Sequence, residues 1–389
     1  MKRERIYLDN AATTPLRTEV GEAMRAVAED SNFNPSSLHA EGRRAAAVLD
    51  DARERVASLL RATRNEIAFT SSGTEADNLA LIGTARRAQP GAHLVTTAIE
   101  HHAVLGAMDR LRDEGFEITV LPVGASGRVD VDQFAAALRP STVMASVMYA
   151  NNEIGTVQPI AELARVARAR GVLFHSDAVQ APSWLALETD ELHVDLLSLS
   201  AHKFGGPKGV GMLYTRRGTP LAPIIHGGGQ EFGRRAGTPN VAGIAGLARA
   251  LELAVLERPE QTARVAGLRD RLERGIVAID DVQINGAGPR LPNIVNASFD
   301  GVESAALLIA LDLAGIAVSA GSACASGSLQ PSHVLAALGS DGRRHGGAIR
   351  FSLGTTTSES DIDRVLAILP AVLAEQRRPV TPHGGMGRV

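Results

Sequence analysis

The stretch TVMASVMYANNEIGTVQPIAELARVARARGVLFHSDAVQ, residues 142–180, contains the pattern that decides the fold. It opens with an apolar run, continues through a helical stretch at 160–171 and closes with a second apolar run at 171–177. Apolar runs with little polar alternation are typical of strands that are buried on both faces of a sheet. A strand, a helix and a second strand in this order indicate neighbouring parallel strands joined by a crossover helix.

The same alternation extends over the middle of the chain. The runs EIAFT, HLVTT, EITVL and VDLLSLS predict further strands, and TEADNLALIGTARRA and HAVLGAMDRLRDEG predict helices between them. We therefore expect an α/β protein whose large domain has a mostly parallel sheet with helices on both faces.

A change of pattern near residue 258 predicts a second, smaller domain. A long helical stretch ends there, and a helix, two or three strands and further helices follow. We expect a large domain at 15–258 and a smaller α+β domain formed by 1–14 and 259–376. The Pro- and Gly-rich stretch at 377–389 predicts a loose tail.

Composition narrows the class of protein. The 389 residues carry a formal net charge of -3, which gives no electrostatic reason to expect a nucleic acid or an anionic membrane as partner. The start MKRERIYLDN has no apolar run behind it, so we expect no signal peptide. Because no apolar run approaches the roughly 18 residues of a membrane span, we expect a cytoplasmic protein.

Cysteine and lysine are scarce. Cys324, the single cysteine, lies in the Gly-, Ser- and Ala-rich stretch SAGSACASGSLQPSHVL, which does not resemble a core. One cysteine excludes an internal disulfide and a multi-cysteine metal site, and we expect no metal. Lysine occurs only at Lys2, Lys203 and Lys208. Lys203 follows the strand VDLLSLS, where α/β proteins bind ligands, and its amine can form a Schiff base. A surface lysine beside a turn is the alternative.

Polar residues also follow other predicted strands. The turn before Gly73 and Thr74 suits an anion because backbone N–H groups are free at a helix start, although Thr74 can also be the helix cap. Asp177 can pair with a pyridine nitrogen or cap the next segment. Arg350, between apolar neighbours, needs a substrate carboxylate or an internal salt bridge. Ser200 and His202, beside Lys203, suit a phosphate, and Gln180 lies one turn after Asp177. Further candidates, each with a solvated turn as the alternative, are His101, Asn152 and Thr238.

These residues form one chemical set. An amine, an acid for a ring nitrogen and donors for a phosphate are what pyridoxal 5'-phosphate (PLP) requires. The residues alone therefore indicate a PLP enzyme. A nicotinamide-dependent dehydrogenase is disfavoured because no G-x-G-x-x-G follows an early strand.

Ten ordered stretches, from YLDNAATTP at 7–15 to IRFSLG at 349–354, resemble the cysteine desulfurase family in its NifS/IscS branch. They include TSSGTEADN, EHHAVL, HSDAVQ, SAHKFGGPKGVG and HGGGQEFGRRAGTPN. That family belongs to the class V aminotransferase group of PLP-dependent transferases of fold type I. The resemblance implies a homodimeric sulfurtransferase that converts L-cysteine to L-alanine. The sulfur would pass, as a persulfide on the enzyme, to acceptor proteins of iron–sulfur cluster biogenesis or tRNA thiolation.

The resemblance also implies a role for each candidate residue. Lys203 would hold PLP and move the substrate proton, His101 would stack on the ring, and Cys324 would be the nucleophile. Arg350 and Asn152 would bind the substrate. The other implied cofactor ligands are Asp177 at the ring nitrogen, Asn152 and Gln180 at the ring oxygen, and Gly73, Thr74, Ser200, His202 and a second subunit's Thr238 at the phosphate.

Two sites depart from the family pattern, and other functions stay open. Ser72-Gly73 stands where Gly-Gly or Gly-Ala is frequent in the family. Gly205 stands where relatives usually carry His or Tyr, which leaves that side of the cofactor less filled. The alternatives are a selenocysteine or cysteine-sulfinate lyase, a class V aminotransferase, and a PLP-free subunit that only binds partners in sulfur assembly. A lyase would not need Cys324.

Overall fold

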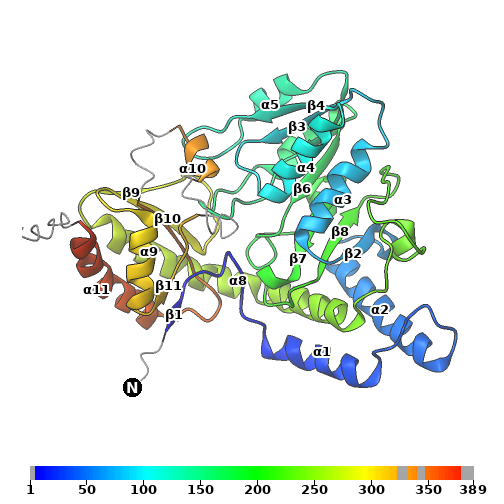
Figure 1. Cartoon of the computed structure of the whole chain (residues 1–389), viewed down its shortest axis with the longest axis horizontal. Helices are drawn as coiled ribbons and strands as arrows, with labels where there is room; N and C mark the ends of the chain where they lie inside the picture. Colours follow the sequence, from blue (N-terminus) through cyan, green and yellow to red (C-terminus); the bar gives the residue numbers. More distant parts are fainter. Residues whose placement is uncertain (1–4, 322–331, 340–346, 378–389) are drawn as a thin grey trace, which may run out of the picture.

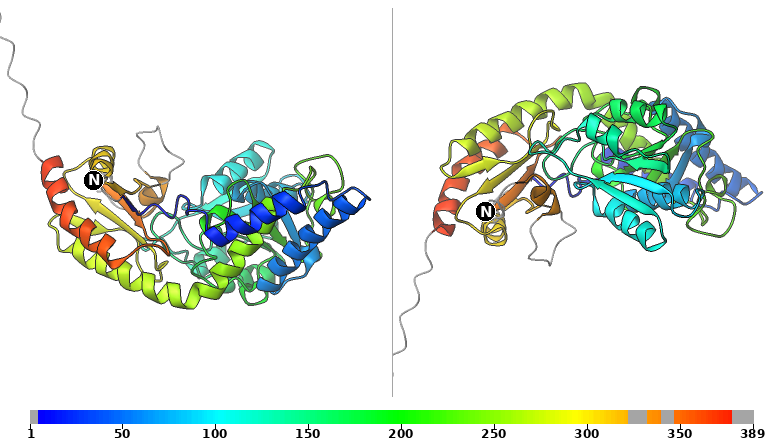
Figure 2. Two further views of the ribbon diagram at one scale, coloured as in Figure 1. Left: turned by 90° about the horizontal axis from the view of Figure 1, so that it is seen from below. Right: turned by 90° about the horizontal axis from the view of Figure 1, so that it is seen from above.

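A single long helix joins the two lobes of the computed structural model (Figure 1). The structure describes residues 5–321, 332–339 and 347–377. The connecting helix is α8 (Val241–Val277), which runs along one side of both lobes (Figure 2).

The large lobe contains a seven-stranded sheet in the order β2-β8-β7-β6-β5-β3-β4. From β7 to β4 all neighbours are parallel, whereas β8 pairs antiparallel with both β7 and β2. The mostly parallel sheet is therefore confirmed, but the sequence did not predict β8. The strands are β2 (Ile67–Thr70), β3 (His93–Thr97), β4 (Glu117–Leu121), β5 (Thr142–Ser146), β6 (Leu173–Asp177), β7 (Leu196–Ser200) and β8 (Gly211–Thr215).

Helices cover both faces of this sheet. Successive strand residues point to opposite faces, so Leu94 and Leu196 pack against α3 and α4, while Val95 and Leu197 belong to the core of the other face. The helices of this lobe are α1 (Thr18–Asp30), α2 (Ala40–Leu59), α3 (Gly73–Ala85), α4 (His102–Asp113), α5 (Val131–Ala137), α6 (Ile160–Ala169) and α7 (Thr189–Leu192), with the 3-10 turns η1 (Arg64–Glu66), η2 (Ala201–Lys203) and η3 (Glu231–Gly233).

The small lobe has its own core. Ile6 and Leu8, from the start of the chain, are buried there with Val295 and Phe351. This agrees with placing the start of the chain in the small domain, although the residue limits of the two domains stay a prediction. The elements of this lobe are β1 (Ile6–Tyr7), β9 (Val282–Ile284), β10 (Ile294–Phe299), α9 (Ser304–Leu313), β11 (Ile316–Ala317), α10 (His333–Ala337), β12 (Ala348–Ser352) and α11 (Glu359–Gln376).

The helix α8 does not end where the sequence predicts. It continues through Pro259, although proline removes one intrahelical hydrogen bond. The continuation follows from burial on both sides of the proline, because Leu253 packs in the large-lobe core and Leu268 in the small-lobe core. Across the described parts of the chain, no helix is long and apolar enough to cross a membrane.

Candidate active site

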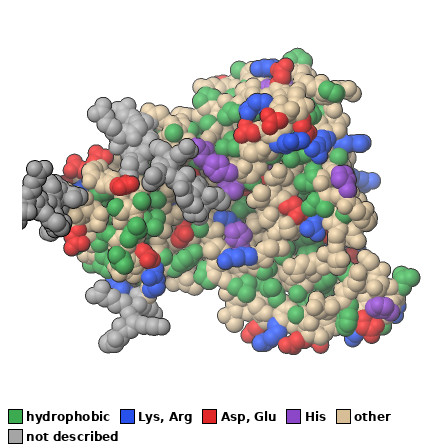
Figure 3. Space-filling view, in the orientation of Figure 1, with side chains coloured by type: hydrophobic (Ala, Val, Ile, Leu, Met, Phe, Trp, Pro, Cys, Tyr) green, Lys and Arg blue, Asp and Glu red, His purple; other side chains and the backbone are tan. Residues whose placement is uncertain are grey.

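One cavity of about 200 Å³ brings most of the predicted site residues together at the carboxyl ends of the large-lobe strands. Figure 3 shows histidine side chains gathered on this face, between the two lobes. The predicted residues that line the cavity are Gly73, Thr74, His101, Asn152, Asp177, Gln180, Ser200, His202, Lys203 and Arg350.

Lys203 lies in η2, directly after β7. Its Nζ donates to the backbone oxygens of Ala11 and Ala12, at 2.7 and 2.8 Å. Gln180 Nε2 donates to the same Ala11 oxygen at 3.0 Å. The loop that follows β1 therefore fixes the amine at the cavity wall, and because it acts through backbone oxygens, no side chain in the sequence indicates this contribution.

The start of α3 forms the wall that suits an anion. Ser72 caps the helix and accepts from Glu75 N at 3.1 Å, so the prediction that Thr74 could be the cap is wrong. A Cβ at Gly73 would lie 2.8 Å from Val179 Cγ2 and 3.1 Å from Ser200 Cβ. Glycine is therefore required for the helix start to lie against the end of β7, and Ser72, Gly73 and Thr74 line the cavity there. A helix start suits an anion because its first backbone N–H groups have no partner within the helix.

Asp177 ends β6 and lines the cavity. Its Oδ1 accepts from Val179 N at 2.9 Å, so it caps the next segment as well as facing the site. Burial raises the pKa of Asp177 to about 6, against the opposing effects of the Val179 hydrogen bond and the charge of Lys203. A pKa of about 6 leaves the carboxyl group mostly ionised at neutral pH, so it can stabilise a cation in the cavity.

Two histidines at the cavity are neutral at physiological pH. His101 caps α4, with Nδ1 accepting from Ala103 N at 3.1 Å. Burial, assisted by the charge of Lys203, lowers the pKa of His101 to about 4. The same two causes lower the pKa of His202 to about 4. An uncharged imidazole at His101 is suited to stacking on a flat ring.

Arg350 is the small lobe's contribution to the cavity. It is 1% exposed. Its Nη2 donates to Asp9 Oδ1 at 2.7 Å and its Nη1 to Asn152 O at 2.8 Å. Within the described residues Arg350 Nε has no hydrogen-bond partner. The internal salt bridge that the sequence left open is present, and Arg350 also lines the cavity.

Thr238 and Cys324 are the predicted residues outside this set. Thr238 is exposed in the segment after η3. Among the described residues, it lines a different cavity together with Ser71 and Arg235. Cys324 lies outside the described residues. At Gly205, a Cβ would lie 2.6 Å from Arg17 Cγ, so the stem of Arg17 fills the space beside the glycine.

Part of the cavity lining is not predictable from the motifs in the sequence. Asp77 lines it from α3 and is buried close to Asp177. Burial raises the pKa of Asp77 well above its usual value, and the charge of Asp177 adds to the rise. Asp77 belongs to the stretch TEADN and lies about one turn into a buried helix. An acidic residue at such a position was the signal in the sequence that could have identified it. The other missed lining residues are Ala11, Ala12, Ser72, Met148, Ala150 and Val179.

Glu100, next to His101, makes the stability of the protein depend on pH. It is 0% exposed, and among the described residues its Oε2 has no hydrogen-bond partner. Burial raises the pKa of Glu100 to about 8, although Thr97 and Met148 N donate to its other oxygen. The unfolded chain ionises this group near its usual pKa of 4.5. The folded protein therefore holds the extra proton, and its stability falls as pH rises from about 4.5 to about 8.

We expect Glu100→Gln to remove this loss, which is on the order of 1 kcal/mol for each pH unit. Thermal unfolding at pH 5 and pH 8 measures it: the advantage of the variant over the wild type should be larger at pH 8. Glu54→Gln, at an exposed position, is the control and should leave the pH dependence unchanged. Equal pH dependence in the wild type and Glu100→Gln would contradict a buried neutral carboxyl.

Comparison with known proteins agrees with this geometry. The family model of the class-V aminotransferases matches residues 6–365. The chain is 49% identical over 386 residues to cysteine desulfurase IscS of Dictyoglomus turgidum, covering 98% of both chains. A solved NifS-like protein superposes with a TM-score of 0.90 at 38% identity, covering 95% of this chain and all of the other. A solved structure of SspA in complex with cysteine superposes with a TM-score of 0.80 at 35% identity, covering 91% of this chain and 100% of the other.

These matches confirm the expected fold over both lobes. The chain therefore belongs to the IscS/NifS cysteine desulfurases of the class-V aminotransferase family, which are PLP-dependent enzymes.

Proposed function

We propose that this protein binds PLP in the 200 Å³ cavity and uses it to transfer the sulfur of L-cysteine to Cys324, leaving L-alanine. The observation that carries the proposal is that one cavity holds Lys203, Asp177 and the start of α3. The cysteine bound in SspA, a similar protein, supports L-cysteine as substrate.

The residues present fit PLP. The start of α3, which only glycine permits to approach β7, would receive the phosphate together with Ser200 and His202. The ionised Asp177 would hold a protonated ring nitrogen, and the neutral His101 would lie on the ring. Asn152 and Gln180 would bind the ring oxygen. When bound, PLP withdraws electrons from the substrate and makes its Cα proton acidic.

The chain's own groups would then carry the remaining work. Lys203 would hold PLP through its amine, and that amine would take up the Cα proton and return it. Arg350 and Asn152 would orient the substrate carboxylate. The Cys324 thiolate would form a bond to the substrate sulfur as the carbon–sulfur bond breaks. The electron pair of the broken bond stays with the carbon, which is protonated to the methyl group of alanine, so persulfide formation needs no outside oxidant.

Two further parts of the proposal concern partners. We propose a homodimer because Thr238 is exposed and is not among the described residues that line the cofactor cavity of its own chain. We also propose that the persulfide sulfur passes to an acceptor protein of iron–sulfur cluster biogenesis or tRNA thiolation. Without an acceptor, a thiol reductant would release it as sulfide.

Product analysis tests the function directly. The purified protein is incubated with PLP, L-cysteine and a thiol reductant, and alanine and sulfide are quantified. We expect the two products in equal amounts. Alanine formed only with a keto-acid present would instead indicate an aminotransferase, and turnover of cysteine sulfinate without turnover of cysteine would indicate a lyase.

Arg350→Gln should raise the KM for L-cysteine about tenfold or more, because the cavity loses its donors for the substrate carboxylate. PLP binding, followed by its visible absorption, should persist. Asp9→Asn is the matched control, since it removes the same ion pair and keeps the guanidinium. If both variants raised KM equally, Arg350 would have only a structural role.

A further inference from the structure

The segment 231–238, which carries Thr238, has an unusual backbone at its start. Three successive residues have left-handed φ values: 48° at Glu231, 59° at Phe232 and 77° at Gly233. For residues other than glycine this conformation costs roughly 1–2 kcal/mol each, so surrounding contacts must hold it.

A buried ion pair holds the start of the segment on β2. Glu231 accepts from both terminal nitrogens of Arg53, at 2.7 and 2.8 Å, and from Phe69 N at 2.8 Å. Arg53 also donates to Ile67 O at 2.7 Å. Because Arg53 and Glu231 are both buried and doubly bonded, the segment leaves β2 in one fixed direction.

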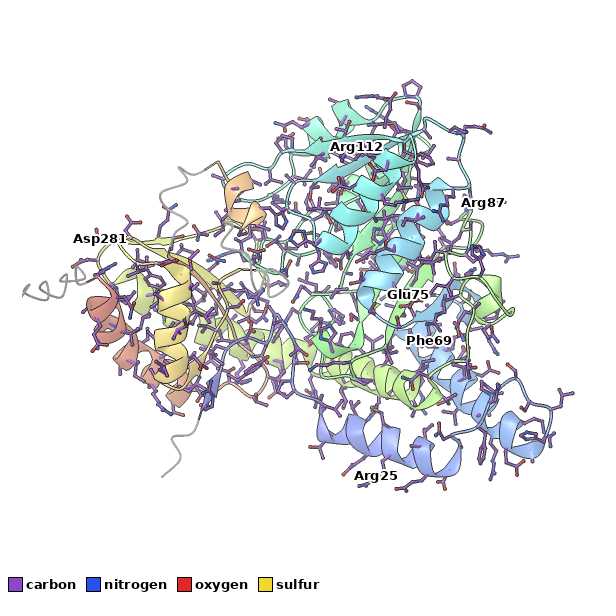
Figure 4. All side chains as sticks on the ribbon, in the orientation of Figure 1. Arg25, Phe69, Glu75, Arg87, Arg112 and Asp281 are labelled. Carbon is purple, nitrogen blue, oxygen red and sulfur yellow. The ribbon has the colours of Figure 1, made fainter. Side chains whose placement is uncertain are left out.

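A second ion pair links the segment to the cofactor cavity. Arg235 Nε donates to Glu75 Oε1 at 2.9 Å, and Ser71 N donates to Glu75 Oε2 at 2.9 Å. The Ser71 hydroxyl donates to the same carboxylate. The side chains are 20% exposed for Arg235 and 10% for Glu75. Figure 4 shows Glu75 at α3 in the same part of the large lobe as Phe69.

The charge of Glu75 is retained in this position. Burial alone would raise the pKa of Glu75, but the hydrogen bonds from Ser71 and Arg235 outweigh burial and hold it below its usual value. The carboxylate therefore attracts Arg235 at neutral pH while it fixes Ser71. Ser71 directly precedes the turn at 72–74 that lines the cavity.

We propose that Glu75 and Arg235 are positioning residues that clamp the turn at 71–74 to the segment 231–238 and so set the affinity for the phosphate of PLP. This inference rests on the proposed function. Thr238 follows Arg235 on the same segment. The clamp would therefore position two groups: the phosphate-binding turn of its own chain, and Thr238, which we propose to reach the site of a second subunit. Neither Glu75 nor Arg235 lines the cofactor cavity in the described residues, so both act through neighbours.

The test compares PLP with pyridoxal, which lacks the phosphate. Apo-protein is titrated with each compound, and binding is followed by the visible absorption of the bound ring. We expect Arg235→Met to weaken PLP binding about tenfold, since a partly buried ion pair is lost, and to leave pyridoxal binding unchanged. A purely structural defect would weaken both compounds alike.

Arg234→Met is the matched control. The neighbouring Arg234 donates to Asn65 O at 2.8 Å and, among the described residues, forms no hydrogen bond with Glu75, so its loss should leave both affinities unchanged. If Arg235→Met does not fold, Glu75→Gln removes the ion pair, retains an acceptor for Ser71 N, and should give the same selective loss. Unchanged PLP affinity, or equal loss of PLP and pyridoxal, would overturn the clamp. A wild type that binds neither compound would instead overturn the proposed function.

Discussion

Lys203→Ala is expected to lose desulfurase activity by about a thousandfold or more, because in the proposed function one amine would both hold the cofactor and move the proton. The cavity supports this expectation, since the Lys203 Nζ is held by two backbone oxygens at a wall shared with Asp177. The variant should also lose the visible absorption that reports a covalently held cofactor. Alanine production and the absorption spectrum are the two measurements.

A second lysine near Lys203 in the sequence provides a matched control for the Lys203→Ala variant. Lys208 is five positions further along the chain and is exposed, so Lys208→Ala should keep both the spectrum and the activity. Binding of PLP without its covalent spectrum in Lys203→Ala would agree with the remaining phosphate and ring contacts. Full activity in that variant would contradict the assignment of the amine.

The fold was predictable where local sequence determines it. Largely apolar runs such as the one that contains β5, separated by amphipathic helices, indicate a parallel sheet with both faces covered. Strand order and β8 were not predictable in this way. The stretch GMLYT is short, follows a glycine-rich loop and pairs antiparallel with β7 and β2, and such long-range pairing leaves no local pattern.

The parts of the candidate site that are formed by chemically distinctive side chains were predictable from the sequence. Lys203, Asp177 and the turn at Gly73 follow strands whose carboxyl ends meet at one sheet edge, and they do line one cavity. Ala11 and Ala12 contribute through backbone oxygens, which no residue type signals. The pairing of Arg350 with Asp9 joins positions 341 residues apart and needed the structure.

Two buried carboxyl groups, those of Asp77 and Asp177, line the cavity, and only one of them is expected to carry a charge. Asp77 and Asp177 are both buried, and Asp177 raises the pKa of Asp77 further beyond the effect of burial. Two ionised carboxyl groups in this position would repel each other in a region of low dielectric. The charge therefore remains on Asp177, which Lys203 favours, and this is the acid that we propose for the ring nitrogen.

Cys324→Ser is expected to lose sulfide release by about a thousandfold or more and to keep PLP binding, because the serine hydroxyl is a far poorer nucleophile toward sulfur. The site for PLP lies among other residues, so the spectral change on adding L-cysteine should persist. This separates loss of sulfur transfer from loss of substrate binding. A lyase would not need the thiol, and it would retain its activity in the variant.

The single cysteine makes the experiment unusually clean. An alkylating agent has one thiol to modify, so the alkylated wild type should match Cys324→Ser, and alkylation should not affect the variant further. With one equivalent of L-cysteine and no reductant, the wild type should gain the mass of one sulfur atom while one alanine is released. Sulfide formation at the wild-type rate by Cys324→Ser would place the sulfur chemistry on another group and contradict the persulfide route.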